Sequence, residues 1–125
     1  MMQYFLSLGS NINAEANIIF AIEQLNKILA NTKFSSIYKT KAEGFEGDDF
    51  LNLVVAGESE LNFDQLNQKL KDIENQSGRK RDVPKFSART LDIDIVLQID
   101  DDEIIYESDE IEKYSFVSEP LKEVL

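Results

Sequence analysis

The order in which helical and strand-like patterns alternate constrains the fold of this chain most. Two segments carry apolar residues at the spacings of three and four that mark one face of an amphipathic helix. These residues are Ile18, Ile22, Leu25 and Leu29 in the first segment, and Phe63, Leu66, Leu70 and Ile73 in the second. Strand-like runs stand before, between and after them, at residues 4–8, 33–38, 50–57 and 90–99. This order predicts an α+β fold, the ferredoxin-like βαββαβ sandwich, with a four-stranded, mostly antiparallel sheet and an added hairpin at residues 104–106.

The two predicted helices are expected to cover one face of the sheet and to leave the other face for a ligand. Asn62 and Gln65 form a capping-box pattern at the start of the second helix, and Gly78 stands where that helix would end. For the first helix, Asn11 or Asn13 would supply the cap.

Composition narrows the chemistry. The chain has 125 residues, which fits a single domain over residues 1–125. It has neither cysteine nor histidine, so we expect any metal ion to be a hard, oxygen-bound one, with Mg²⁺ first. A net charge of −11 argues against a nucleic-acid partner. No signal peptide or membrane-spanning run is recognisable, so we expect a cytoplasmic protein with no membrane partner. We also expect a monomer.

Two carboxylates lie two residues apart in the last predicted core strand. Alternate side chains of a strand share a face, so Asp92 and Asp94 point one way, and Ile93 and Ile95 point the other. The strand rise of roughly 3.3 Å per residue puts the two aspartate Cβ atoms about 7 Å apart. Unless a cation compensates, each carboxylate raises the pKa of the other. If Leu51, Leu53 and Val55 face the helices, Asn52 lies on the same face of the sheet as the two aspartates. A slip of one residue in strand register would reverse this placement.

The alternative is that the two aspartates form the water-facing side of an edge strand. The placement of arginine favours a ligand instead. All three arginines of the chain, Arg79, Arg81 and Arg89, fall within eleven residues directly before the aspartates. Because arginine suits bidentate phosphate recognition, this arrangement predicts a site for Mg²⁺ and a polyphosphate.

At this point the sequence resembles a known family. The segment Lys85-Phe-Ser-Ala-Arg-Thr-Leu-Asp-Ile-Asp-Ile-Val96 is similar to the signature of 6-hydroxymethyl-7,8-dihydropterin pyrophosphokinase. Other segments agree in order and position, namely Leu6–Asn11, Tyr38–Thr40, Phe50–Asn52, and Glu74 followed by Gly78–Arg81. The resemblance spans nearly the whole chain, which is identified as a short, divergent member.

The resemblance implies an ATP-dependent pyrophosphokinase of folate biosynthesis. Such an enzyme transfers pyrophosphate from ATP to the hydroxymethyl group of the pterin and leaves AMP. The family pattern implies that Asp92 and Asp94 hold two Mg²⁺ ions, and that Arg79 and Arg89 stabilise charge on the phosphates. These four residues are the expected catalytic group.

The resemblance also implies two sets of contacts to the small-molecule substrates. Those to ATP would come from Glu74, Arg79, Arg81, Arg89, Ile95, Lys113 and Tyr114. Those to the pterin would come from Thr40, Phe50, Asn52 and Phe116. In the second set the two phenylalanine rings would stack on the flat pterin, and the Asn52 amide would bind its donor and acceptor edge.

The sequence departs from the family pattern near its C-terminal end. Family members commonly have a histidine and a longer basic stretch before the matching phenylalanine, whereas here Glu112–Ser115 runs directly into Phe116. Lys113 could replace the missing cation. We expect an active enzyme that is slower than full-length relatives. Two alternatives remain open, a non-catalytic ferredoxin-like ligand-binding domain derived from this family and a phosphotransferase acting on another small alcohol.

Overall fold

An antiparallel sheet forms the middle layer of the computed structural model, which describes residues 1–41, 47–79 and 90–125. Over these residues the sheet has six strands in the order β2-β4-β1-β5-β6, with β3 also paired to β4. The strands are β1 (Met2–Ser10), β2 (Ala30–Phe34), β3 (Tyr38–Thr40), β4 (Phe50–Ser59), β5 (Asp92–Asp100) and β6 (Glu103–Glu107). The helices are α1 (Ala14–Ile28), α2 (Phe63–Gln76), α3 (Glu110–Lys113) and α4 (Ser115–Val124).

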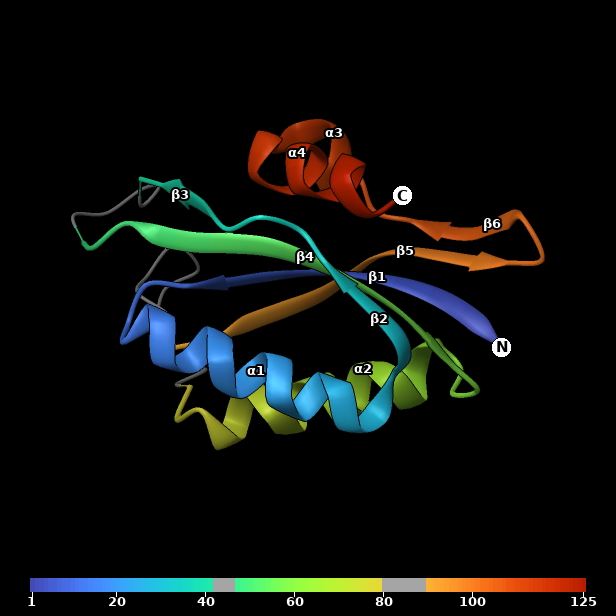
Figure 1. Cartoon of the computed structure of the whole chain (residues 1–125), viewed down its shortest axis with the longest axis horizontal. Coiled ribbons are helices and arrows are strands. Elements are labelled where there is room, and N and C mark those ends of the chain that lie inside the picture. Colours follow the sequence, from blue (N-terminus) through green and yellow to red (C-terminus); the bar gives the residue numbers. More distant parts are fainter. Residues whose placement is uncertain (42–46, 80–89) are drawn as a thin grey trace.

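The two long helices lie together on one face of the sheet, as the sequence predicts (Figure 1). Their apolar stripes and the strands form one buried core, which includes Leu25, Leu70, Leu53 and Ile93. The predicted capping box begins α2: Asn62 Oδ1 accepts from Gln65 N at 2.9 Å, and Gln65 Oε1 accepts from Asn62 N at 3.0 Å. Gly78 follows the helix with a φ of 87°, the left-handed conformation that ends many helices.

The opposite face of the sheet is not left entirely free, contrary to the prediction. Helices α3 and α4 lie over it (Figure 1). Val117, Leu121 and Val124 of α4 share a second buried core with strand residues such as Phe5 and Val54. The reason is that the central strands carry apolar residues on both faces, and the second apolar face needs its own cover.

Other details also differ from prediction. The stretch predicted at residues 33–38 is divided into β2 and β3, which together with β6 raises the sheet from four strands to six. Asn13 occupies the N-cap position of α1 with a φ of 45°, but its side chain makes no capping hydrogen bond there. Within the described residues, no helix is long and apolar enough to cross a membrane.

Strand register brings the predicted site residues together. The central strand β1 pairs with β4 on one side and with β5 on the other. Gly9 stands opposite Asn52 in β4 and opposite Asp92 in β5, while Ser7 stands opposite Asp94. Because directly paired residues project from the same face, the predicted common face for Asn52 and the two aspartates is confirmed.

The second core generates a stability prediction. Leu121 is 4% exposed, so Leu121→Ala removes buried apolar contacts and leaves a cavity beneath α4. We expect the free energy of unfolding to fall by about 2–4 kcal/mol, measured by urea denaturation. Leu125→Ala is the matched control, since Leu125 is 68% exposed. Equal stability of the two variants would contradict the packing of α4 on the sheet.

Candidate active site

The two aspartates occupy the first part of β5, beyond the reach of β6. Strand β6 pairs only with the second part of β5, from Leu97 to Asp100. Ile93 and Ile95 are buried in the core beneath α1 and α2, whereas Asp92 and Asp94 are half-buried on the other face. The strand therefore anchors the pair rigidly through its apolar side and presents both carboxylates on its polar side.

The close spacing of the two aspartates affects the pKa of Asp94, as the sequence predicts. The pKa of the Asp94 carboxyl is raised to about 8, first because the group is desolvated and second because the charge of Asp92 lies nearby. Glu110 and Glu74 add smaller contributions of the same sign. A cation bound between the two aspartates would reverse these effects.

One arginine partly offsets the negative charge. Arg79 Nη1 lies 2.8 Å from Asp92 Oδ1 and 2.7 Å from Glu74 Oε2. Its Nε is buried and has no hydrogen-bond partner within the described part of the chain. The guanidinium group is thus fixed at the head of β5, beside the Asp92 carboxylate.

Glu74 fixes the positions of the Arg79 side chain and of the start of β5. It lies on α2 and is 3% exposed. Besides the ion pair with Arg79, its Oε2 accepts a hydrogen bond from the backbone N–H of Ile93 at 2.7 Å. Glu74 therefore joins α2, Arg79 and β5, a structural connection that the sequence did not reveal.

The aspartate pair fits Mg²⁺ better than a softer metal. Over residues 1–41, 47–79 and 90–125, no cluster of three or more His, Cys, Asp or Glu side chains is placed to hold a metal ion. Mg²⁺ needs no such cage, because it commonly takes one or two carboxylates and completes its shell with water and substrate phosphates.

On β4, two strands along the sheet from β5, a second group forms around Asn52. Its Nδ2 donates to Thr40 Oγ1 at 2.8 Å, and Thr40 pairs with Phe50 in the sheet. Asn52 is 4% exposed, so its amide is held in one orientation. A Cβ on Gly9 would lie 3.1 Å from Asn52 Oδ1 and 3.7 Å from the Phe50 ring. The absence of a side chain at Gly9 lets these groups lie over β1, a role that the sequence analysis missed.

The remaining described site residues are Ile95 on β5 and three residues where α3 ends and α4 begins. The rings of Tyr114 and Phe116 stack with centroids 4.8 Å apart and planes inclined by 23°. Lys113 is exposed and forms an ion pair with Asp109 at 2.9 Å, which raises the pKa of the lysine. Ile95 buries its side chain in the core, so any contact with ATP would come from its backbone. Arg81 and Arg89 lie outside the described residues.

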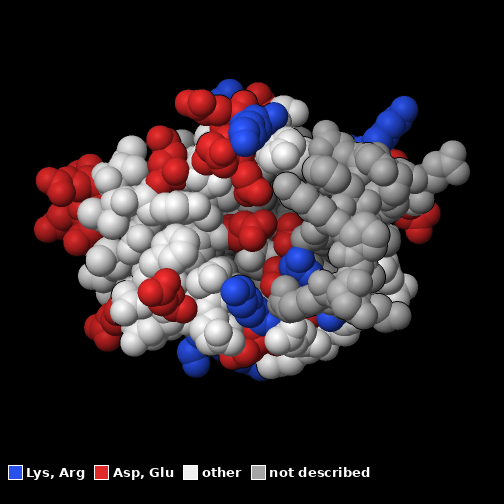
Figure 2. Space-filling view, turned by 180° about the vertical axis from the view of Figure 1, so that it is seen from behind, with Lys and Arg blue, Asp and Glu red and all other residues white. Residues whose placement is uncertain are grey.

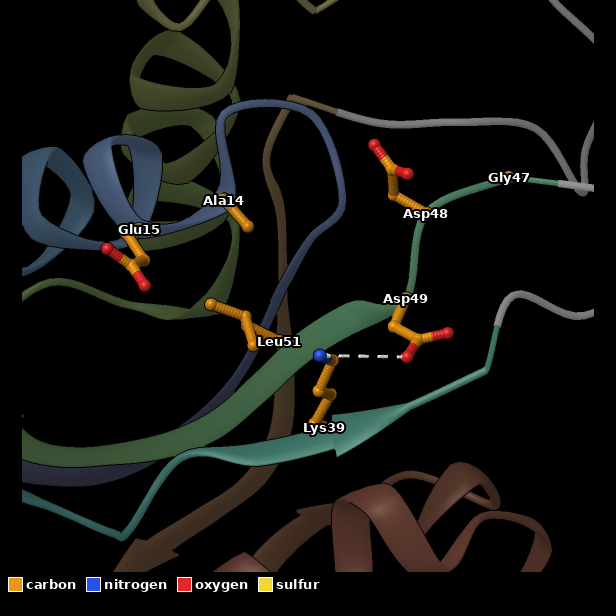
Figure 3. Close-up of a pocket in the computed structure, with 7 residues that line it drawn as sticks. All are labelled: Ala14, Glu15, Lys39, Gly47, Asp48, Asp49 and Leu51. Atoms are coloured by element: carbon orange, nitrogen blue, oxygen red, sulfur yellow. Dashed lines mark ion pairs between the residues drawn. The ribbon is translucent and has the colours of Figure 1, made fainter.

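A surface hollow lies apart from these residues. A hollow of about 470 Å³ opens beside the start of α1 and is lined by Glu15, Lys39, Asp48, Asp49 and Leu51, among others, with Lys39 Nζ 3.9 Å from Asp49 Oδ2 (Figure 3). None of the predicted site residues lines it.

Figure 2 shows acidic side chains near the middle of one face and a second acidic group at one end of the molecule, where the β5–β6 turn lies.

Comparison of the sequence with known proteins agrees with the geometry of the site. The family described as 7,8-dihydro-6-hydroxymethylpterin-pyrophosphokinase (HPPK) matches residues 5–125. Three proteins named 2-amino-4-hydroxy-6-hydroxymethyldihydropteridine pyrophosphokinase are similar. That of Aquifex aeolicus is 39% identical over 81% of this chain and 64% of its own length. That of Bacillus subtilis is 35% identical over 96% and 76%, and that of Haemophilus influenzae is 37% identical over 78% and 62%.

The chain thus spans just under two thirds of two of these relatives and about three quarters of the third. The match to the family nevertheless covers nearly all of its residues, including both aspartates and Arg79. The chain belongs to the 7,8-dihydro-6-hydroxymethylpterin-pyrophosphokinase family.

Proposed function

We propose that this chain transfers pyrophosphate from ATP to 6-hydroxymethyl-7,8-dihydropterin and releases AMP, in folate biosynthesis. The observation that supports this most is the pair Asp92 and Asp94, presented on the polar face of β5 beside the fixed guanidinium of Arg79. Family membership supplies the substrates.

The proposed roles of the charged residues are supported by the positions of Asp92, Asp94 and Arg79 and by the family pattern. Asp92 and Asp94 would hold Mg²⁺, and we propose two ions. Bound there, Mg²⁺ supplies positive charge to the ATP phosphates and lowers the pKa of the accepting hydroxyl group. Arg79 offers its remaining N–H groups to phosphate oxygens while Glu74 keeps it in place. We propose that Arg89 also stabilises phosphate charge, and that Arg81 and Lys113 contribute further positive charge around ATP.

The roles of the neutral residues concern orientation. Asn52 is held by Thr40, so its amide can offer a fixed hydrogen-bonding edge to the pterin. We propose that Phe50, at the start of β4, and Phe116, in the first turn of α4, stack on the pterin rings. Tyr114 and the backbone of Ile95 would contact ATP.

Incubation with ATP, Mg²⁺ and the pterin tests the activity directly. We expect AMP to form only when the pterin is present. ADP in place of AMP would indicate a phosphotransferase, and binding of both ligands without turnover would indicate the non-catalytic domain. Either result would overturn the proposal.

Asp92→Asn and Asp94→Asn test the metal assignment. Each substitution replaces a carboxyl group that would hold the metal ion with a neutral amide of the same shape, so we expect turnover to fall by about 1000-fold or more. Asp101→Asn in the exposed β5–β6 turn is the matched control, because its φ of 49° is tolerated by asparagine. A fully active Asp92 or Asp94 variant whose circular dichroism matches wild type would show that the metal assignment is wrong.

The raised pKa of Asp94, about 8, gives a pH prediction for the metal-free protein. Between the ordinary aspartate pKa of about 4 and this value, the folded state keeps a proton that the unfolded state releases. The stability from this group is therefore complete at low pH and is lost as the pH rises to about 8. Asp94→Asn cannot ionise, so we expect its melting temperature at about pH 8 to exceed that of wild type by roughly 2–6 °C.

Excess Mg²⁺ should affect the melting temperatures of the two proteins differently. It should raise the melting temperature of wild type, because it binds the folded state, and should change that of Asp94→Asn little. If metal-free wild type and Asp94→Asn had the same melting temperature at every pH, the raised pKa of Asp94 would be contradicted.

A further inference from the structure

A glutamate near the end of α4 makes three hydrogen bonds to a distant segment. Glu123 Oε1 accepts from the backbone N–H of Ser36 and from its hydroxyl, each at 2.8 Å. Glu123 Oε2 accepts from the hydroxyl of Tyr38, the first residue of β3. The two segments are more than 80 residues apart in sequence, so the carboxylate joins elements that no local pattern connects.

The electrostatics of this contact are those of a charge-assisted hydrogen bond. The bond from Tyr38, together with those from Ser36, lowers the pKa of Glu123. The same bond raises the pKa of the Tyr38 hydroxyl. Glu123 is therefore an ionised acceptor and Tyr38 a neutral donor at ordinary pH, which gives the bond between them a defined direction.

The contact connects two walls of the proposed pterin site. On one side, β3 places Tyr38 opposite Asn52 and Thr40 opposite Phe50, and Thr40 accepts a hydrogen bond from Asn52. On the other side, α4 carries Phe116 in its first turn and Glu123 in its last. The Glu123 carboxylate thus ties the helix that carries Phe116 to the strand that holds Asn52.

Apolar packing alone would not fix this relationship. Helix α4 rests on the sheet through Val117, Leu121 and Val124, and such contacts are non-directional. Three directed hydrogen bonds at one end of the helix restrict its sliding and rotation. We propose that Glu123, acting through Tyr38 and Ser36, is a positioning residue that sets the separation of Phe116 from Asn52 and so determines affinity for the pterin. This inference rests on the proposed function of the site.

The chain offers a matched control on the same helix. Glu119 is an exposed acid whose partner is Lys122, at 3.4 Å. Its charge also raises the pKa of Tyr38, though only as the smallest of the causes, so Glu119→Gln removes a similar charge without removing the bonds to β3. The test variants are Tyr38→Phe, which loses one bond, Glu123→Ala, which loses all three, and Glu123→Gln, which keeps the reach of the side chain.

Steady-state kinetics should separate positioning from general destabilisation. We expect Glu123→Ala to raise the KM for the pterin by about tenfold and Tyr38→Phe by about threefold, with kcat and the KM for ATP changed less than about twofold. The KM of Glu123→Gln for the pterin should lie close to that of wild type, and the KM of Glu119→Gln should equal it. Adding Tyr38→Phe to Glu123→Ala should cause no further change, because the bond is already absent.

Hydrogen exchange gives a readout that does not need turnover. In Glu123→Ala the amide of Ser36 and those of β3 should exchange faster than in wild type, while the amides of β1 should not change. An unchanged pterin KM in a folded Glu123→Ala, or equal increases in both KM values, would overturn this inference and leave the proposed function intact. A wild-type protein that neither turns over nor binds the pterin would overturn both.

Discussion

The pairing of β1 with two strands at once is the constraint on which the rest of the site depends. Gly9 stands opposite Asn52 on one side and opposite Asp92 on the other, so a single register places the Asn52 amide and the aspartate carboxylates on one face. Because side chains alternate, a slip of one residue in either ladder would turn one of these groups into the apolar core. The cores on both faces make that slip costly, since Leu53 and Ile93 would leave the first core.

Two acidic side chains lie close together on β5, where their like charges repel each other. Asp94 is desolvated beside Asp92, and the Arg79–Glu74 pair holds a guanidinium group against only one of the two aspartates. The buried Glu74 is satisfied by Arg79 and by the backbone N–H of Ile93, so it fixes the head of β5 without neutralising Asp94. The pKa of Asp94 is thus shifted by burial and by a like charge, which is how pKa values are perturbed at many functional sites.

The sequence predicted those features that depend on local periodicity. The stripes of α1 and α2, the capping box at Asn62, the turn at Gly78 and the common face of the aspartates follow from spacings within one segment. It did not predict α4 as a cover for the sheet, although apolar residues on both faces of β1 were a signal of a second layer. The roles of Gly9, Glu74 and Glu123 depend on contacts between distant segments, and no spacing in the sequence specifies these.

The protonation state of Asp94 tests the central claim most directly, because it reports the local charge before any substrate binds. Carboxyl carbon NMR of isotopically labelled protein, assigned with Asp94→Asn, would follow this group through a pH titration with and without Mg²⁺ and an ATP analogue. We expect a pKa near the value of about 8 in the metal-free protein and a decrease of several units when Mg²⁺ and the analogue are bound. An ordinary aspartate pKa under both conditions would contradict this expectation.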